Sequence, residues 1–420
     1  MVEGADPVED GLIAARDGRI VYAGPAGGHH GEAQPDETLE ARGCVALPGL
    51  VNAHTHCAMT LLRGFADDMQ LKPWLEEMIW PTEARLTAED VYWGAMLGSV
   101  EMLRAGVTCF SDMYHFAEAG TRAAVEAGIR VCPSGVLLGF LDTADEMLER
   151  ALEFTARLAA EGHPRVHPML GPHAPYTCPD RLLRRVADGA AAQGIPIHIH
   201  LAETRQEVDE SLAAHGETPV AHLERIGLLE TPVNAAHCVW LTDRDIEILA
   251  ERHVGVVHCP GSNMKLASGV CPVPKLLGRG VVVGLGTDGA ASNNNLDLLE
   301  EARLAALVHK LHDLDPTVVD AGRALALATR GAAEALGLGD VVGTLEPGKR
   351  ADIAVIDLTA PHLAPGHHLV SDLIYSARAS DVVHTVVEGA VVVRNREVVG
   401  LDEGEVLRQA RARGRRLAEG

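Results

Sequence analysis

Short apolar segments alternate with longer stretches rich in Ala, Leu, Glu and Arg along the middle of this chain. One cycle leads from "VHPMLGPHAPYTC" (166–178) through a predicted helix at 179–193 to "IPIHIHLAET" (195–204). The alternation continues with "VNAAHCV", a helix expected to begin near Thr242, "VGVVHCPGSNMKL", a short helix and "VVVGLGTDGAASNN". Strands that alternate with helices form βα units with a parallel sheet. The pattern therefore predicts a β/α barrel over residues 49–347.

Both ends of the chain have the pattern of antiparallel strands instead. Residues 9–24 alternate apolar and polar side chains around an Asp-Gly pair, which is typical of a hairpin turn. The segments "ADIAVIDL" (351–358) and "VVHTVVEGAVVVRNREVVG" (382–400) are similar in style. We therefore predict an α/β fold: a (β/α)8 TIM-like barrel with a small β-sandwich domain formed by residues 1–48 and 348–420. The length of 420 residues suits a barrel of roughly 250–400 residues with such a domain.

The composition limits the classes of partner. Apolar residues make up 47% and aromatic residues only 3%, so Ala, Val, Leu and Ile must build most of the core. The formal charge of 36 − 59 = −23 argues against nucleic acid or an anionic membrane as the main partner. One basic run, "RQARARGRR" (408–416), is expected to be the solvated face of a last helix.

The cysteines and the N-terminus indicate a cellular compartment. The eight cysteines are scattered without a CxxC pair, which is typical of reduced thiols in a cytosolic protein. The first residues have neither a basic nor an apolar signal-peptide region, and no run approaches a membrane span. We expect a cytoplasmic protein that forms a homo-oligomer, a dimer or a tetramer.

Two histidines lie one residue apart where a predicted strand ends. In "PGLVNAHTH" (48–56), His54 and His56 share one face, because alternate side chains of a strand point to the same side. Two neutral imidazoles suit a divalent metal ion. An isolated pair of this kind is more often hydrogen-bonded in a core or on a surface, so the rest of the chain has to decide.

Other predicted barrel strands also end in residues that bind metals or transfer protons. Chemistry in a β/α barrel takes place at the carboxyl ends of its strands. Besides His54 and His56, the residues in this position are His173, His200, Glu203, His237 and Asp288. This recurrence favours a metal site over paired structural histidines.

The residue types suggest how the chemistry is divided. His54, His56, His200 and Asp288 can hold a zinc-like ion and leave one position for water, whose pKa the metal lowers to give a hydroxide nucleophile. His198 lies on the same alternation as His200 and competes with it as a ligand; we assign His200 because it lies nearer the strand end.

Proton transfer falls to the neighbouring groups. Glu203 can carry the proton of the water to a leaving nitrogen, and Asp288 can also accept it. His237 can polarise the substrate or fix the hydroxide.

The motifs that contain these residues resemble those of the amidohydrolase superfamily. They are similar in particular to the cytosine-deaminase/triazine-hydrolase branch, which includes S-adenosylhomocysteine and 5′-methylthioadenosine deaminases. The motifs are "PGLVNAHTHCAMTLLRGFADD", "WLEEMIWPTEARLT", "GPHAPYTC", "HIHLAET", "AAHCV", "HCPGSNMKL", "LGTDGAASNNNLDL" and "EPGKRADIAVID". They follow the order of the family from about residue 10 to 400.

The resemblance implies substrate contacts. Glu83 in "WPTEARLT" is expected to bind ribose hydroxyls, since a carboxylate can accept two hydrogen bonds from a vicinal diol. His173 is expected to contact the substrate, and the segment from Trp74 to Trp80 to cover the pocket. The alternative for Trp74 is a packed tryptophan at the end of an amphipathic helix.

We expect one divalent metal ion, zinc first, with iron or manganese as alternatives. Binuclear barrels of this kind often bridge their metals with a carbamylated lysine. No lysine occurs between Lys72 and Lys265, so the middle strands cannot supply one. A bridging Glu or Cys stays open.

The leading functional hypothesis is a metal-dependent deaminase of adenine nucleosides, in which metal-bound hydroxide attacks C6 and ammonia leaves. An alternative keeps the machinery and changes the ring, to guanine, 8-oxoguanine, a pterin or a triazine. A barrel that has lost catalysis is a third hypothesis, but all four ligands are present.

Arginines that hold the homocysteine carboxylate in some relatives are missing, because none occurs between Arg130 and Arg150 and Gly135 takes the first position. Arg150 is expected on a solvated helix face.

Overall fold

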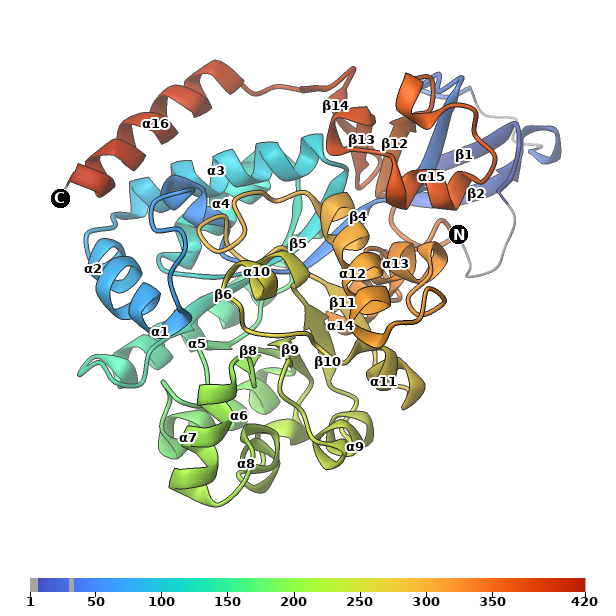
Figure 1. Cartoon of the computed structure of the whole chain (residues 1–420). Helices are drawn as coiled ribbons and strands as arrows, with labels where there is room; N and C mark the ends of the chain where they lie inside the picture. Colours follow the sequence, from blue (N-terminus) through green and yellow to red (C-terminus); the bar gives the residue numbers. More distant parts are fainter. Residues whose placement is uncertain (1–6, 30–33, 420) are drawn as a thin grey trace.

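Eight parallel strands form the centre of the molecule (Figure 1). The computed structural model describes residues 7–29 and 34–419, so that 1–6, 30–33 and 420, which we assigned to the terminal domain, lie outside the described residues. The barrel strands are β4 (Leu50–Thr55), β5 (Val107–Tyr114), β6 (Arg130–Leu137), β7 (Gly171–Pro172), β8 (Ile197–Leu201), β9 (Val233–His237), β10 (Gly255–His258) and β11 (Val283–Leu285).

The strands close into a barrel. They pair in chain order from β4 to β7 and from β8 to β11, and a parallel bridge between Leu170 and Ile197 joins the two halves. On the other side, the Asp288 N–H donates to the His54 carbonyl at 3.0 Å. Gly286 lies so close to β4 that an added Cβ would be 2.9 Å from the backbone of His54. The predicted (β/α)8 fold is confirmed.

Helices surround the strands (Figure 1). They are η2 (Cys57–Leu62), α1 (Leu71–Pro73), η3 (Trp74–Ile79), α2 (Trp80–Glu83), α3 (Ala88–Arg104), α4 (Ala117–Ala127), α5 (Ala144–Glu161), α6 (Asp180–Gln193), α7 (Arg205–His215), α8 (Pro219–Arg225), η4 (Leu228–Glu230), α9 (Asp243–Glu251), α10 (Pro260–Lys265), α11 (Val273–Gly278), α12 (Leu298–Asp313), α13 (Ala321–Leu327) and α14 (Arg330–Ala335). Local signals set their ends: Gly194 follows α6 at φ 65°, and Thr242 caps α9 in a capping box with Asp245.

Small side chains fill part of the barrel interior. One buried cluster contains Val51, Ala53, Cys109, Cys132 and Val257, from four of the strands. All eight cysteines are free. The scarcity of aromatic residues and the use of buried Cys as small apolar groups are consistent with this core.

Both chain ends contribute to a second unit, at the upper right in Figure 1. Its strands are β1 (Gly11–Arg16), β2 (Arg19–Pro25), β3 (Cys44–Pro48), β12 (Ile353–Asp357), β13 (Val382–Val387), β14 (Ala390–Arg394) and β15 (Glu397–Val398). The antiparallel hairpin β1–β2 and the sheet β15-β14-β13-β12-β3 share a core with Ile20, Ile353 and Val355. The helices are η1 (Ala26–Gly28), η5 (Pro361–Leu363), α15 (Leu369–Tyr375) and η6 (Ala379–Asp381). The exact boundaries at residues 48 and 347 stay a prediction.

The last helix, α16 (Glu403–Glu419), leaves this unit and lies across α3 of the barrel (Figure 1). Its Arg413 is mostly buried and donates to the Asp90 carboxylate at 3.2 Å, and Arg416 bonds the same carboxylate. The prediction of a wholly solvated basic face is therefore wrong for Arg413, because a buried acid on α3 gives it a partner.

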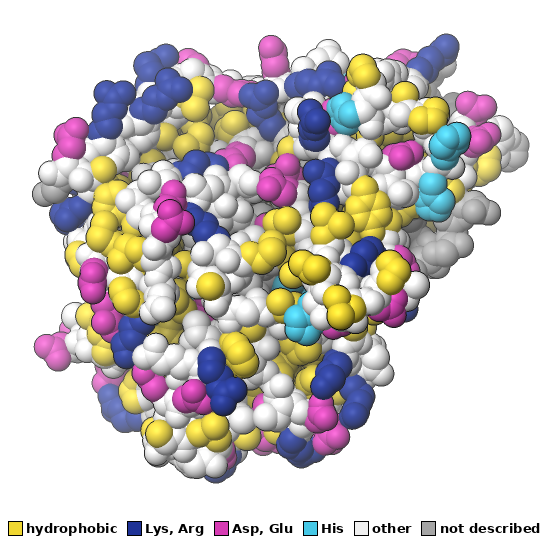
Figure 2. Space-filling model, in the orientation of Figure 1, with side chains coloured by type: hydrophobic (Ala, Val, Ile, Leu, Met, Phe, Trp, Pro, Cys, Tyr) yellow, Lys and Arg dark blue, Asp and Glu magenta, His cyan; other side chains and the backbone are white. Residues whose placement is uncertain are grey.

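Basic and acidic side chains are interspersed over the face of the molecule in Figure 2. Within the described ranges, no helix has the length and apolarity needed to cross a bilayer.

Candidate active site

The strand ends bring the predicted residues together. His54 belongs to β4 and His56 directly follows it; His200 belongs to β8, His237 ends β9, and Asp288 lies three residues beyond β11. His237 and Asp288 have φ values of 72° and 60°, which few residues other than glycine adopt. Such conformations persist where the surrounding structure holds them, and they occur often at functional sites.

Three imidazole nitrogens lie close together, and two of them face one carboxylate oxygen. Asp288 Oδ1 lies 3.4 Å from His54 Nε2 and 3.3 Å from His56 Nε2. His200 Nε2 lies 3.2 Å from His56 Nε2. All four side chains are buried or nearly so.

The second nitrogen of each ring is already bonded. His56 Nδ1 donates to the Met113 carbonyl at 2.6 Å and His200 Nδ1 to the His173 carbonyl at 2.6 Å. A carbonyl can only accept, so the proton of each of these two rings lies on Nδ1 and the Nε2 lone pair faces the centre.

His198 lies behind His54 rather than in the centre. The His54 Nδ1 and His198 Nε2 atoms are 2.7 Å apart, and His198 Nδ1 is 3.1 Å from the Ser111 hydroxyl. If His54 donates a hydrogen bond from Nδ1 to His198 Nε2, and His198 donates one from its Nδ1 to the Ser111 hydroxyl, His54 also presents an Nε2 lone pair. His200 therefore lies in the cluster, with His198 behind it.

Lone pairs and a carboxylate at these distances repel one another unless a cation lies between them. Burial lowers the pKa of His54 to about 4, so its ring is neutral, as a metal ligand must be. Two overlapping triads could hold an ion: His54 with His56 and His200, and His54 with His237 and Asp288. The donor set of imidazole nitrogen and one carboxylate suits a zinc-like ion.

Asp288 is fixed by its neighbours. Ser262 and Ser292 donate their hydroxyls to Oδ2 at 2.6 and 2.8 Å, and the Gly289 N–H donates to Oδ1 at 2.7 Å. Burial alone would raise the pKa of Asp288, but His54 and the other histidines lower it well below its usual value. The carboxylate is therefore ionised and aimed at the histidines.

Glu203 and His237 lie beside the cluster. Ser268 donates to Glu203 Oε1 at 3.3 Å, and His237 Nε2 is 3.8 Å from Glu203 Oε2. Burial raises the pKa of Glu203, which favours a carboxyl group that can both take and return a proton. His237 donates from Nδ1 to Asn263 Oδ1 at 2.9 Å, which directs Nε2 towards Glu203.

A cavity opens above the cluster. It has about 600 Å³ of empty space including its mouth, within the usual range of small-molecule sites. Its lining includes Glu83, His173 and the buried Trp74 together with the cluster. Burial lowers the pKa of His173 to about 3, so its ring is neutral. Every residue that we predicted for the site thus lies in the cluster or on this lining.

The sequence matches a known protein family over most of its length. The model of the amidohydrolase family matches residues 45–392. The chain belongs to this family. In this amidohydrolase, the His and Asp side chains of the cluster form two groups that could hold a metal ion.

Two similar proteins have names that describe related activities. A protein of Moorella thermoacetica named 5-methylthioadenosine/S-adenosylhomocysteine deaminase is 51% identical over 403 residues, which are 96% of this chain and 94% of that protein. The structure of an adenosine deaminase from Xanthomonas campestris with bound zinc has a TM-score of 0.95 and 39% identity, and the match covers 98% of this chain and 95% of that one.

A second similar structure is of a protein whose name describes another activity. It is the atrazine chlorohydrolase of Arthrobacter aurescens complexed with zinc, with a TM-score of 0.89, 27% identity, and coverage of 97% of this chain and 96% of that one.

Arg150 does not reach the cavity of this amidohydrolase. It lies on α5, its side chain is 68% exposed, and it pairs with Glu146 one turn away. None of the described residues that line the cavity is an arginine or a lysine.

Sequence reasoning missed several groups on the site. His115 directly follows β5 and lines the cavity, so the strand-end criterion that found the other histidines would have found it too. Ser262, Asn263 and Ser268 hold Asp288, His237 and Glu203, but serine and asparagine in loops carry no comparable signal.

Proposed function

We propose that this amidohydrolase is a metal-dependent hydrolytic deaminase of adenine nucleosides. Its substrates would be 5′-methylthioadenosine, adenosine and S-adenosylhomocysteine, and the products the inosine analogue and ammonia. The observation that carries the proposal is the position of a buried Glu203 beside three converging imidazoles and Asp288, in one cavity with Glu83. The names of the relatives from Moorella thermoacetica and Xanthomonas campestris support it.

We assign His54, His56, His200 and Asp288 to one zinc ion, with iron or manganese as alternatives. When bound, such an ion makes water available as a nucleophile near neutral pH. The absence of a lysine on the middle strands supports a single ion.

The remaining residues would bind the substrate and move protons. Glu203, with its raised pKa, can accept a proton from water and deliver it to the ring nitrogen next to C6. The proton of the hydroxyl group added at C6 would then pass, through Glu203 or Asp288, to the amino group, so that the C6–N bond breaks and ammonia leaves a carbonyl at C6. Against burial, the Glu203 carboxylate raises the pKa of His237, so its ring can carry a proton on Nε2 as well as on Nδ1 and would donate a hydrogen bond towards the developing oxygen at C6. His173 and Trp74 would contact the base. Glu83 would accept hydrogen bonds from the ribose diol.

A second candidate function follows from the similarity to the chlorohydrolase: hydrolysis of another heterocycle, such as a triazine, guanine, 8-oxoguanine or a pterin. Glu83 disfavours it, because a free base or triazine offers no diol to this buried carboxylate.

The deciding experiment is an ammonia-release screen of the metal-loaded protein. The panel contains adenosine, 5′-methylthioadenosine, S-adenosylhomocysteine, guanine and, with chloride release as a second readout, atrazine. We expect turnover of the adenine nucleosides, loss of activity on chelation and recovery when metal is restored. Activity on guanine or atrazine alone would overturn the adenine assignment.

Two further expectations stay predictions. Elemental analysis should give about one metal ion per active chain, and two tightly held ions would contradict the single site. Sedimentation should show a homo-oligomer, a dimer or a tetramer.

A further inference from the structure

We infer that His115 is a second ribose-binding residue, which acts with Glu83 as a clamp on the sugar hydroxyls. This inference rests on the proposed function, and it assigns a role to a residue outside the metal and proton-transfer groups.

The Glu83 carboxylate is buried but not saturated with hydrogen bonds. It ends α2, its side chain is 7% exposed, and it lines the cavity. Among the described residues, the basic side chain that pairs with it is His115, whose Nε2 lies 3.5 Å from Oε2. That distance exceeds a normal hydrogen bond, so lone pairs of Glu83 are left for a ligand. Burying a carboxylate in this way is costly unless a ligand or a partner compensates for it.

His115 reaches the same point from the other wall. It follows β5, its side chain is 25% exposed, and it also lines the cavity. Its ring contacts Tyr114 edge-on with centroids 5.5 Å apart, which restricts its orientation. Burial and the Glu83 carboxylate raise the pKa of Tyr114, so Tyr114 also lies against Glu83. Tyr114, which ends β5, and His115, which follows it, thus both face the carboxylate.

A ribose diol fits between these groups. Glu83 can only accept hydrogen bonds, and each hydroxyl both donates and accepts. A hydroxyl that donates to Glu83 keeps lone pairs, which need a donor in a buried site. The imidazole Nε2–H of His115 is placed to be that donor. Glu83 would accept hydrogen bonds from both hydroxyls of the diol. His115 would donate a hydrogen bond to the oxygen of one of these hydroxyls.

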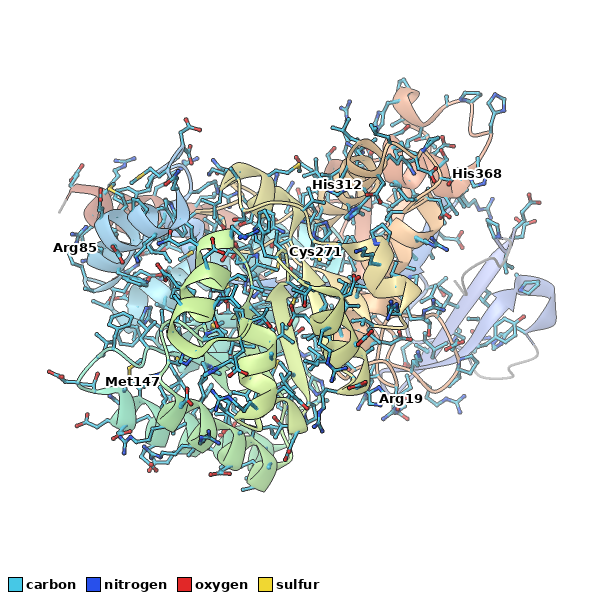
Figure 3. All side chains as sticks on the ribbon, turned by 60° about the horizontal axis from the view of Figure 1, so that its bottom comes forward. Arg19, Arg85, Met147, Cys271, His312 and His368 are labelled. Carbon is cyan, nitrogen blue, oxygen red and sulfur yellow. The ribbon has the colours of Figure 1, made fainter. Side chains whose placement is uncertain are left out.

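The test compares nucleosides that differ by one hydroxyl. Steady-state kcat and KM are measured for adenosine, 2′-deoxyadenosine and 3′-deoxyadenosine with wild type, His115→Ala, His115→Gln and Glu83→Ala. His312→Ala is the matched control, because His312 is an exposed histidine on α12 (Figure 3) that bonds to the adjacent Asp313. Metal content and the melting temperature are recorded for each variant.

In wild type we expect kcat/KM for adenosine to exceed that for at least one deoxynucleoside by about tenfold or more, because a missing hydroxyl leaves buried groups unpaired. His115→Ala should reduce this ratio to within about threefold, mainly through KM, with metal content unchanged. His115→Gln keeps an N–H donor and should recover part of the ratio. Glu83→Ala should remove the discrimination at both positions and leave any activity on free adenine less affected.

Three results would overturn the inference. The first is an equal fall for all three nucleosides in His115→Ala, which would indicate a structural role. The second is an unchanged kcat/KM ratio in His115→Ala while Glu83→Ala loses the discrimination. The third is an equal reduction of this ratio in the control, His312→Ala. Failure of wild type to turn over any adenine nucleoside would instead reject the proposed function, and this inference with it.

Discussion

The carboxyl group of Glu203 is held between Ser268 and His237, and burial raises its pKa. Replacing Glu203 with Gln keeps the shape and removes the group that exchanges the proton. We expect Glu203→Gln to retain its metal and to lose about 10²–10⁴-fold in kcat. The measurement pairs kinetics with elemental analysis. Glu210→Gln, on an exposed position of α7, is the control. Near wild-type turnover of the metal-loaded Gln variant would contradict the mechanism.

Individual residues of the site could be predicted where a side chain of a metal-binding type lies at the end of a predicted strand, as His200 and Asp288 do. The hydrogen bonds that fix them could not. The alternation puts His198, whose ring faces His54, on the same face as His200, so in the sequence only the position of His200 nearer the strand end favoured it as the ligand. Only the depth of each side chain along the strand separates the two, and that depends on the closed barrel.

At the scale of elements, local signals predicted α6 and α9 closely, since a glycine and a capping box mark their ends. The segment at Trp74 was less predictable. It forms a π-helix, η3, whose wider turn is not encoded in a simple apolar period. Trp74 is buried in this segment and also lines the cavity, so the structure shows it packed, and its contact with a substrate stays a prediction.

The contact of α12 with β10 gives the protein a pH-dependent element. His309 of α12 lies against His258 with ring centroids 5.1 Å apart, and Asp313 and His312 are the nearby charged groups on its helix. Burial lowers the pKa of His309 to about 4. The unfolded chain takes up this proton below about pH 6.5 and the folded protein only below about 4, so stability is lost as the pH falls through that window.

We therefore expect His309→Gln to be less sensitive to acid than wild type. Between pH 7.5 and 5.0 the wild type should lose about 2 kcal/mol more of its free energy of unfolding than the variant. Urea denaturation of both proteins at the two pH values measures the difference. His312→Gln, on the exposed side of the same helix, should behave as wild type. Parallel losses in all three proteins would show that other groups set the acid stability.

At the scale of the whole molecule, a buried ion pair joins the barrel to the terminal unit. Arg130 of β6 is fully buried and donates to both oxygens of Asp352 at 3.0 Å and to Glu388 at 2.7 Å. Removal of one partner leaves the other charges buried, which typically costs about 3–5 kcal/mol. Chemical denaturation should show a loss of this size for Arg130→Ala and less than about 0.5 kcal/mol for the exposed Arg150→Ala. A small loss of unfolding free energy in Arg130→Ala would mean that water or structural relaxation stabilises the charges of Asp352 and Glu388 in place of the arginine.

The charge of the whole molecule also bears on its choice among the adenine nucleosides. The chain carries a formal charge of −23, and the described lining of the cavity has no lysine or arginine. The homocysteine part of S-adenosylhomocysteine ends in a carboxylate, which a site of this family would be expected to hold with a bidentate arginine. Arg150 cannot serve, because it lies on the exposed face of α5. Desolvation of the carboxylate would therefore be poorly compensated, whereas a methylthio group or a 5′-hydroxyl makes no such demand.

We predict a higher kcat/KM for 5′-methylthioadenosine and adenosine than for S-adenosylhomocysteine, measured under one set of conditions with the metal-loaded protein. Introduction of a cation should shift this preference. Gly135 belongs to β6, and the next residue of this strand, Val136, lines the cavity. The nearest atom to a Cβ added at Gly135 is 3.9 Å away, so the backbone tolerates a side chain. Gly135→Arg should raise the activity on S-adenosylhomocysteine relative to 5′-methylthioadenosine, with Gly135→Gln as the uncharged control. A clear preference of wild type for S-adenosylhomocysteine would contradict the prediction, and would mean that its carboxylate is held by hydrogen bonds from uncharged groups.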